Sequence, residues 1–122
     1  MTVGEVIRQT LALLNYTDTR VDGEVPGGHG LYKRVLPLVN QTAAELWFRE
    51  HSEPFPPLRD LQATVPLPDR VVQTVLPYGV AMLLAAADGD ADNQTLFASL
   101  YDGHRTATTE TAYIVDTQPT TE

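Results

Sequence analysis

The sequence contains no cysteine and few basic residues, and both shortages exclude classes of function. Without cysteine the chain has no disulfide framework, no thiolate metal ligand and no thiol nucleophile. Eight Lys and Arg residues stand against sixteen Asp and Glu, for a formal net charge of −8, and the basic residues are scattered along the chain. Because a surface of this sign repels phosphate, the sequence argues against direct readout of DNA.

Long apolar runs are also missing. The longest, from Val75 to Ala87, has 13 residues and contains Pro77 and Gly79, whereas a helix needs about 20 apolar residues to cross a bilayer. The first residues lack the charged and then apolar pattern of a signal peptide. We expect a chain that is neither secreted by that route nor membrane-spanning. Its composition, 43% hydrophobic and 20% charged over 122 residues, is typical of one globular domain.

Helical periodicity dominates the first half of the chain. Thr2 and Glu5 have the spacing of a capping box, and apolar residues recur behind them at intervals of three and four, which predicts a helix over about residues 2–15. The same spacing predicts a longer helix over 30–50. Pro37 lies inside it, so we expect a kink or a later start.

The second half holds two further predicted helices. Asp69 precedes an apolar stretch and is a suitable N-cap for a helix over 69–87. This helix is apolar nearly all round, so we expect it at the centre of the core, with a kink at Pro77. A fourth helix is predicted over 91–108.

The connecting segments complete the predicted architecture. Residues 16–29 are rich in glycine and charge, which indicates an irregular loop. Apolar residues alternate over about 58–67, which favours a short extended segment with one half-buried face. We therefore predict a mainly α fold, a four-helix bundle-like domain over residues 1–108. The Thr-rich tail, 109–122, is expected to be flexible and disordered until assembly.

The stretch DGDADN, which begins at Asp88, has aspartates at alternate positions like the start of a calcium loop. An EF-hand loop also needs glycine at its sixth position and glutamate at its twelfth, but Asn93 and Ser99 occupy them. Gly89 suits a helix C-cap, and Asp90 or Asp92 suits the next N-cap. We interpret the stretch as a helix junction rather than a metal site.

Residues that commonly carry chemistry are sparse and far apart. The three histidines have no local ligand spacing, and neither serine lies in a nucleophile-elbow motif. Glu50 and Glu53 could form an acid and base pair, but nothing in the sequence marks them as desolvated. We predict no catalytic, cofactor-binding or metal-binding residues and no enzymatic activity. The histidines and serines are His29, His51, His104, Ser52 and Ser99.

Two stretches resemble a known family. LPDRVVQTVLPYGVAMLLAAADGDADNQTLFASLYDGHR, residues 67–105, is similar to the C-terminal half of head-tail connector, or adaptor, proteins of tailed bacteriophages. VLPLVNQTAAELWF, residues 35–48, is similar to their long helix. The resemblance implies a small α-helical virion protein that assembles in the neck as a homo-oligomeric ring of about a dozen copies. The ring would lie between portal and tail, and DNA would pass through it during ejection.

Further expectations follow from that resemblance. The subunit would be made in the host cytoplasm, would contact the portal protein and the tail or tail-completion proteins, and would need no cofactor or small-molecule substrate. We expect the loop 16–29 to order on assembly, as would the tail around the candidate assembly interface Tyr113, Ile114 and Val115, for example by adding a strand to a neighbour. Two alternatives remain open. One is a small helical regulatory or protein-binding module that dimerises through the apolar helix 69–87; the other is an enzyme whose site is assembled from distant residues.

Overall fold

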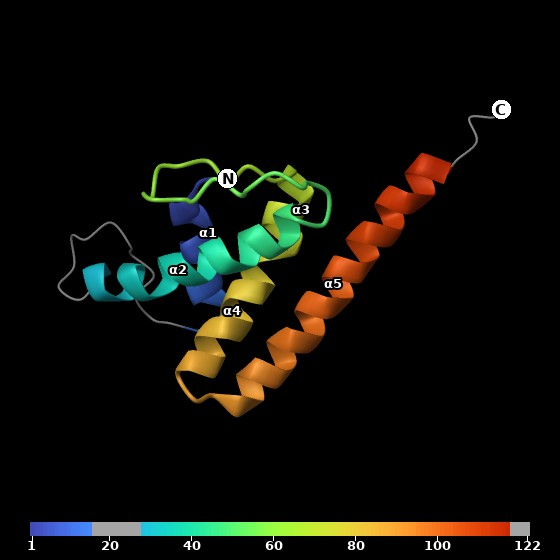
Figure 1. Ribbon diagram of the computed structural model, residues 1–122. Helices are drawn as coiled ribbons and strands as arrows, with labels where there is room; N and C mark the ends of the chain where they lie inside the picture. Colours follow the sequence, from blue (N-terminus) through green and yellow to red (C-terminus); the bar gives the residue numbers. More distant parts are fainter. Residues whose placement is uncertain (16–27, 118–122) are drawn as a thin grey trace.

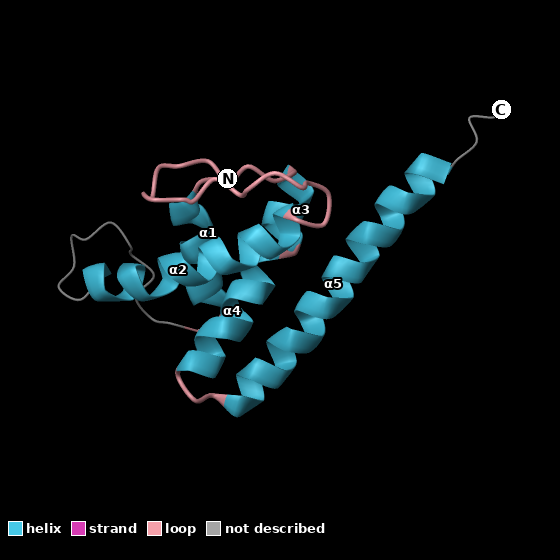
Figure 2. Cartoon of the chain, in the orientation of Figure 1, coloured by secondary structure: helices cyan, strands magenta, loops and turns pink. Residues whose placement is uncertain are grey.

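The computed structural model describes residues 1–15 and 28–117, and in these residues the secondary structure is helical, with no strand. The five helices in chain order are α1 (Val3–Leu13), α2 (Gly28–Trp47), α3 (Asp69–Thr74), α4 (Leu76–Ala87) and α5 (Ala91–Thr117) (Figures 1 and 2). The prediction of a mainly α fold is confirmed. Most of the predicted loop, residues 16–27, and the last residues, 118–122, lie outside the described residues.

The first helix begins at the predicted capping box. The backbone N–H of Thr2 donates to Glu5 Oε1 at 2.8 Å, and the backbone N–H of Glu5 donates to Thr2 Oγ1 at 3.2 Å. Each side chain thus satisfies an N–H that the helix itself leaves unpaired. Behind the box, Val6, Ile7 and Leu11 are fully buried, so the apolar face that the sequence predicts is the face that packs.

The second helix is the long one predicted, and it contains Pro37. Because proline has no N–H, the carbonyl of Lys33 receives no helical hydrogen bond at this point. Val35, Val39 and Ala43 on the same helix are fully buried. The helix therefore keeps its inward face through the proline.

The helix predicted over 69–87 is divided at Val75 into α3 and α4. Pro77 stands in the first turn of α4, where its missing N–H is least costly. In one continuous helix the carbonyl of Gln73 would accept a hydrogen bond from the backbone N–H of residue 77, which proline lacks. The side-chain amide of Gln9 donates to this carbonyl instead, at 3.4 Å. The proline thus explains why one predicted helix is observed as two.

The predicted N-cap role of Asp69 is wrong. The capping residue is Pro68, with extended backbone at φ −56° and ψ 142°, and no side chain caps this end. Asp69 is already the first residue of α3. From there its carboxylate still lies in the first turn, where negative charge favours the helix dipole.

Helix α4 lies at the centre of the fold, where it packs against α1, α2, α3 and α5. Leu76, Val80 and Leu84 on this helix are fully buried, as predicted for the central element. By length and composition alone, Asp69–Ala87 could cross a membrane, and 56% of that stretch is buried inside the protein. The apolar surface proposed above for dimerisation of a regulatory module is thus largely used within the chain.

The segment predicted to be extended crosses the start of α1 and pairs with it at one isolated bridge. The bridge joins Thr2 and Thr64 in antiparallel sense, and the N–H of Val3 donates to the carbonyl of Ala63 at 2.9 Å. The N-terminal stretch becomes helical at Val3, so it offers too few extended residues for a ladder. A bridge forms where the sequence predicts a short strand.

The predicted alternation in this segment is confirmed. Val65 is buried and Leu61 and Ala63 are partly buried, whereas Gln62 and Thr64 are exposed. Successive side chains of extended backbone point to opposite sides, so one side of the segment covers the core.

The last helix, α5, begins at Ala91 as predicted but ends at Thr117 rather than near 108. Threonine is a weak helix former but does not stop a helix, and the next proline after Ala91 is Pro119. Figure 1 shows the C-terminal part of α5 extending away from the other helices. The expectation that the tail orders only on assembly stays a prediction.

Candidate functional site

The acidic turn between α4 and α5 is a helix junction, as the sequence predicts. Gly89 has φ 75°, a left-handed conformation that suits glycine. Its N–H donates to the carbonyl of Ala86 at 3.2 Å, and the N–H of Asp90 donates to the carbonyl of Ala85 at 2.9 Å. These two bonds are those of a Schellman motif, which closes the end of a helix.

Two carboxylates of this turn, those of Asp88 and Asp90, have structural partners. Asp90 accepts the N–H of Asn93 on Oδ1 at 3.1 Å, which caps α5. Asp88 forms an ion pair with Arg34 of α2. In the part of the chain that the structure describes, no group of three or more His, Cys, Asp or Glu residues is arranged to hold a metal ion.

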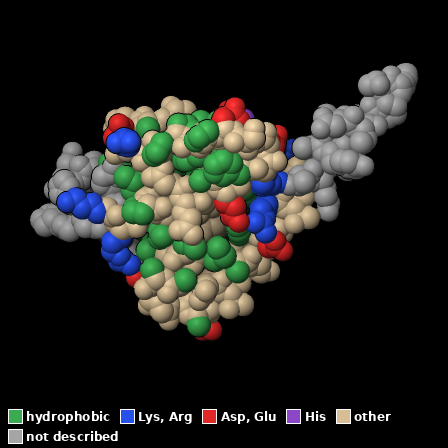
Figure 3. All heavy atoms as spheres, in the orientation of Figure 1, with side chains coloured by type: hydrophobic (Ala, Val, Ile, Leu, Met, Phe, Trp, Pro, Cys, Tyr) green, Lys and Arg blue, Asp and Glu red, His purple; other side chains and the backbone are tan. Residues whose placement is uncertain are grey.

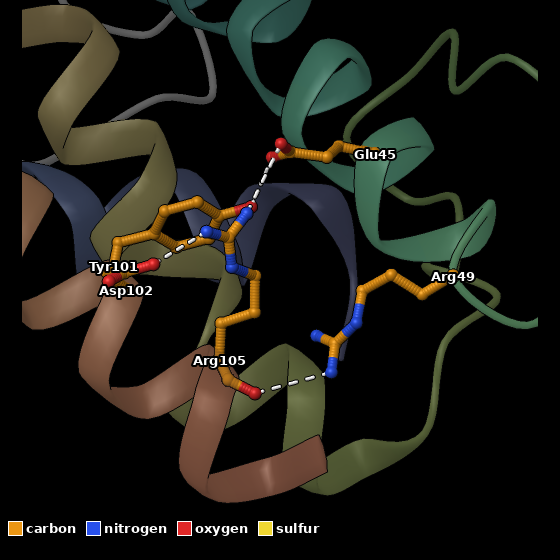
Figure 4. Close-up of polar contacts among 5 residues, drawn as sticks. All are labelled: Glu45, Arg49, Tyr101, Asp102 and Arg105. Atoms are coloured by element: carbon orange, nitrogen blue, oxygen red, sulfur yellow. Dashed lines mark hydrogen bonds and ion pairs between the residues drawn. The ribbon is translucent and has the colours of Figure 1, made fainter.

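A polar cluster joins α2 to α5 (Figure 4). The Tyr101 hydroxyl donates to the carboxylate of Glu45. Arg105 reaches the same carboxylate at 3.4 Å and the carboxylate of Asp102 at 2.7 Å. Its guanidinium carbon also lies 4.9 Å from the centroid of the Tyr101 ring. From the turn that follows α2, Arg49 donates to the backbone carbonyl of Arg105 at 3.3 Å.

The electrostatics of this cluster favour a structural role for Tyr101. Burial of the ring, together with the hydrogen bond to Glu45, raises the pKa of the Tyr101 hydroxyl far above its ordinary value. The hydrogen bond to Asp102 raises the pKa of Arg105 in turn. The phenol is therefore protonated at neutral pH and acts as a hydrogen-bond donor. A general base would need the opposite shift.

Close packing surrounds the Tyr101 ring. A Cβ built on Gly79 of α4 would lie 2.6 Å from Thr42 Cγ2 and 2.7 Å from Tyr101 Cε1, so only glycine fits there without movement. Beside this contact, α2, α4 and α5 leave a pocket of about 250 Å³. The Thr42 hydroxyl lies here, buried and without a hydrogen-bond partner among the described residues. The pocket is lined by Gln41, Thr42, Glu45, Met82, Leu83 and Tyr101.

Two of the histidines take part in aromatic stacks. The ring of His51 stacks on Trp47 with centroids 3.8 Å apart, and the ring of His104 stacks on Tyr78 at 4.7 Å. The first stack lies at the C-terminal end of α2 and the second joins α4 to α5, so the two stacks share no residue. The side chain of His29 lies outside the described residues.

Part of the surface of α5 is apolar and exposed. Leu96 is 50% exposed. One turn further, the helix carries a shallow hollow of about 320 Å³, whose lining is Ser99, Leu100, Gly103, His104 and Ala107. A Cβ on Gly103 would meet nothing within 4 Å. The rest of the described chain therefore gives no steric reason for a glycine in the middle of this helix.

The candidate interface residues Tyr113, Ile114 and Val115 fall within the last turns of α5. Their side chains lie outside the described residues. Positions 96 and 114 are five helical turns apart at about 3.6 residues per turn, so they share one angular position on the helix. Position 114 of the predicted interface thus lies on the same line along α5 as position 96.

The sequence reasoning missed the polar cluster and the hollow. Glu45 and Tyr101 are 56 positions apart, and nothing in either segment alone predicts that they meet. The hollow had a weak signal, because Leu96, Leu100 and Ala107 recur at helical spacing beside Gly103. On the face shown in Figure 3, the Lys and Arg side chains form several separate groups rather than one patch, in line with their scatter in the sequence.

No family model matches the chain, and neither a curated protein nor a solved structure was found that matches it. The likeness to head-tail connectors therefore rests on the two stretches quoted above. Contacts of the described residues are the remaining source of inference about function.

Proposed function

We propose that this chain is a structural assembly protein, a head-tail connector subunit that forms a ring between portal and tail in a tailed-phage virion. The observation that carries the proposal is α5, a helix of 27 residues that packs on α4 and then extends beyond the other helices (Figure 1). A terminal helix that extends past its own domain offers backbone and side chains to neighbouring subunits. It also carries Tyr113, Ile114 and Val115, the apolar residues of the Thr-rich end.

The polar cluster supports this reading of α5. Glu45 of α2 and Arg49 of the turn after it contact Tyr101 and Arg105 of α5, so the near part of α5 is tied to the domain by two residues. The far part is thereby held in a defined direction. An assembly subunit needs such a rigid base, because each copy must present its contacts at the same angle for a ring to close.

The charge of the chain fits a channel through which DNA passes. A net charge of −8 repels phosphate, and a lining that does not bind DNA does not hold it in transit. The proposal also includes a bundle-like packing of the helices with bends at Pro37 and Pro77. No chemistry, cofactor or small-molecule substrate is part of it.

Deleting residues 109–122 tests the proposal. We expect the shortened chain to keep its helical circular dichroism and thermal unfolding, because the described core residues all precede position 109. We also expect it to lose ring formation, seen for the full chain by negative-stain microscopy and light scattering as particles of about a dozen subunits.

The matched control deletes only residues 118–122, which leaves the whole of α5 and its apolar triplet in place. This control should assemble like the full chain. Rings of undiminished yield from the 109–122 deletion, or a full chain that stays smaller than a ring at high concentration, would contradict the proposal.

A further inference from the structure

The connection between α2 and α3 contains a proline-rich stretch, residues 53–59, with the sequence EPFPPLR. Proline fixes its own φ at about −65°, and the residue before a proline is restricted to extended backbone. Pro54, Pro56 and Pro57 therefore hold most of the stretch in the polyproline II conformation, a left-handed helix with three residues per turn. Figure 1 shows the connection between α2 and α3 on the outside of the helices.

Burial along the stretch follows the same period of three. Phe55 is partly buried and Leu58, three positions later, is only 6% exposed, whereas Pro54, Pro56 and Pro57 are exposed. A polyproline II helix has three edges, because its side chains repeat every third residue. One edge thus faces the protein and the other two face solvent.

The inward edge is held by side chains of α2. Asn40 accepts the N–H of Leu58 at 2.7 Å and donates to its carbonyl at 2.9 Å. The indole N–H of Trp47 donates to the carbonyl of Glu53 at 2.9 Å, and the Trp47 ring meets the ring of Phe55 edge-on with centroids 5.9 Å apart. The stretch is therefore fixed at both ends before a partner arrives, which lowers the cost of ordering it on binding.

The two exposed edges have the spacing P-x-x-P-x-Arg. Pro54 and Pro57 lie on one edge, and Pro56 and Arg59 lie on the other. Grooves lined by aromatic side chains, as in SH3 domains, bind prolines at this spacing in the polyproline II conformation. A carboxylate at the end of such a groove can bind an arginine through charge-assisted hydrogen bonds.

We propose that residues 53–59 are a docking segment for a domain of the SH3 class. The aromatic groove of that domain receives Pro54 and Pro57, and acidic residues at one end of the groove receive Arg59. The structure supports this occupant because the residues that turn inward, Phe55 and Leu58, are the variable positions of the spacing, and the residues that the groove requires are exposed.

The charges along the stretch set the direction of docking. Arg59 stands at one end, and Glu53 lies about 19 Å away at the other, at about 3.1 Å per residue. The carboxylate of Asp60 accepts the N–H of Gln62 at 2.9 Å, so it has a partner within the following turn. An acidic groove end is thus attracted to the end of the stretch that carries Arg59 and is repelled from the end that carries Glu53.

This docking goes beyond the proposed ring and does not rest on it. The stretch belongs to the connection between α2 and α3, whereas the ring proposal depends on the far part of α5. Binding of the partner needs only a single folded chain.

Isothermal titration calorimetry of the full chain with a purified SH3 domain that selects P-x-x-P-x-Arg peptides tests the proposal. We expect wild type to bind, and Pro57→Ala and Arg59→Glu each to raise the dissociation constant at least about tenfold. Arg70→Glu is the matched control, because it makes the same charge change at an exposed arginine of α3, and it should bind like wild type. Circular dichroism checks that the variants are folded. Equal weakening by Arg59→Glu and Arg70→Glu, or no binding of wild type at about 1 mM of the domain, would overturn the proposal.

A peptide of residues 52–60 tests whether the fold presents the stretch. Because the chain holds these residues in the bound conformation, we expect the folded protein to bind the same SH3 domain at least as tightly as the peptide does. Binding of the peptide without binding of the folded protein would show that the stretch is inaccessible to the groove, and it would overturn the proposal.

Discussion

Two glycines, one in α4 and one in α5, lie in contrasting surroundings. At Gly79, where α4 meets α5, an added Cβ would lie within 2.7 Å of both Thr42 and Tyr101; at Gly103, on the outer face of α5, it would meet nothing within 4 Å. Both residues stand inside helices, where glycine is unfavourable. The first is explained by contacts inside the chain, and the second is not.

The difference separates a contact that holds the fold together from an exposed position that the fold does not use. Around Gly79 the Tyr101 ring is buried and bonded to Glu45, so substitutions should act on stability. Around Gly103 the helix is exposed, so substitutions should leave the packing of the core unchanged. The two sides therefore respond to the same kind of change in opposite ways.

The largest effect is expected for Gly79→Ala. The new methyl group would overlap Thr42 and the Tyr101 ring, which are held by helices on either side. Overpacking of this kind costs about 1–3 kcal/mol, and we expect the upper part of that range because both distances are below 3.0 Å. Urea unfolding followed by circular dichroism measures the change. A loss of less than about 0.5 kcal/mol, the level of an ordinary surface substitution, would show that the contact is not close.

Removing the Tyr101 hydroxyl comes next. Tyr101→Phe keeps the ring but deletes the hydrogen bond to Glu45, and we expect a loss of about 1–2 kcal/mol at neutral pH. Tyr78→Phe removes a hydroxyl from the same interface and is the matched control, with a smaller expected loss. Thermal unfolding of the three chains side by side gives the comparison. Equal losses in the two variants would show that the bond to Glu45 contributes nothing specific.

The same residue predicts a pH dependence. The pKa of Tyr101 is raised in the folded protein, so the stabilisation is complete below the unfolded-state pKa of about 10 and declines as the pH rises toward the folded-state value. Wild-type stability should therefore fall above about pH 10 more steeply than that of Tyr101→Phe. Parallel profiles for the two chains would contradict this assignment.

The smallest effect, and one of opposite sign, is expected for Gly103→Ala. Because the site is open, alanine should stabilise the single chain by about 0.5–1 kcal/mol through helix propensity alone. The measurement belongs at low concentration, where assembly of the chain does not contribute to stability. Destabilisation would mean that Gly103 is needed by the fold itself, and the contrast with Gly79 would fail.

The parts of the fold that the sequence predicts well depend on near neighbours. The capping box at Thr2 and Glu5 and the glycine closure at Gly89 are set by residues three or four positions apart. Alternation from Leu61 to Val65 follows from strand geometry over a few residues. In each case the local chemistry alone fixes the conformation, and the structure confirms it.

The parts that the sequence does not predict depend on residues far apart. Asn40 binds the backbone of Leu58 in both directions, accepting its N–H at 2.7 Å and donating to its carbonyl at 2.9 Å. Glu45 and Tyr101, which are also far apart in the sequence, meet through one side-chain hydrogen bond. No local pattern encodes which helices lie side by side, so a polar residue gives no sign of its distant partner.

Helix ends form a third group, in which the local rule is present but a competing one wins. Asp69 has the chemistry of an N-cap, yet Pro68 is fixed in extended backbone one residue earlier and takes that position. The helix α5 passes through the Thr-rich segment to Thr117 because nothing before Pro119 stops it. The Thr-rich composition of the tail, which offers little to bury, argued for an earlier end of the helix.

The central claim is that the inner side of α5 holds the fold while Gly103, on its exposed side, does not contribute to packing. Urea unfolding of Gly103→Leu at low concentration tests this most directly, because a Cβ at this position meets nothing within 4 Å. The account predicts a chain at least as stable against unfolding as wild type. A loss of more than about 1 kcal/mol would contradict it.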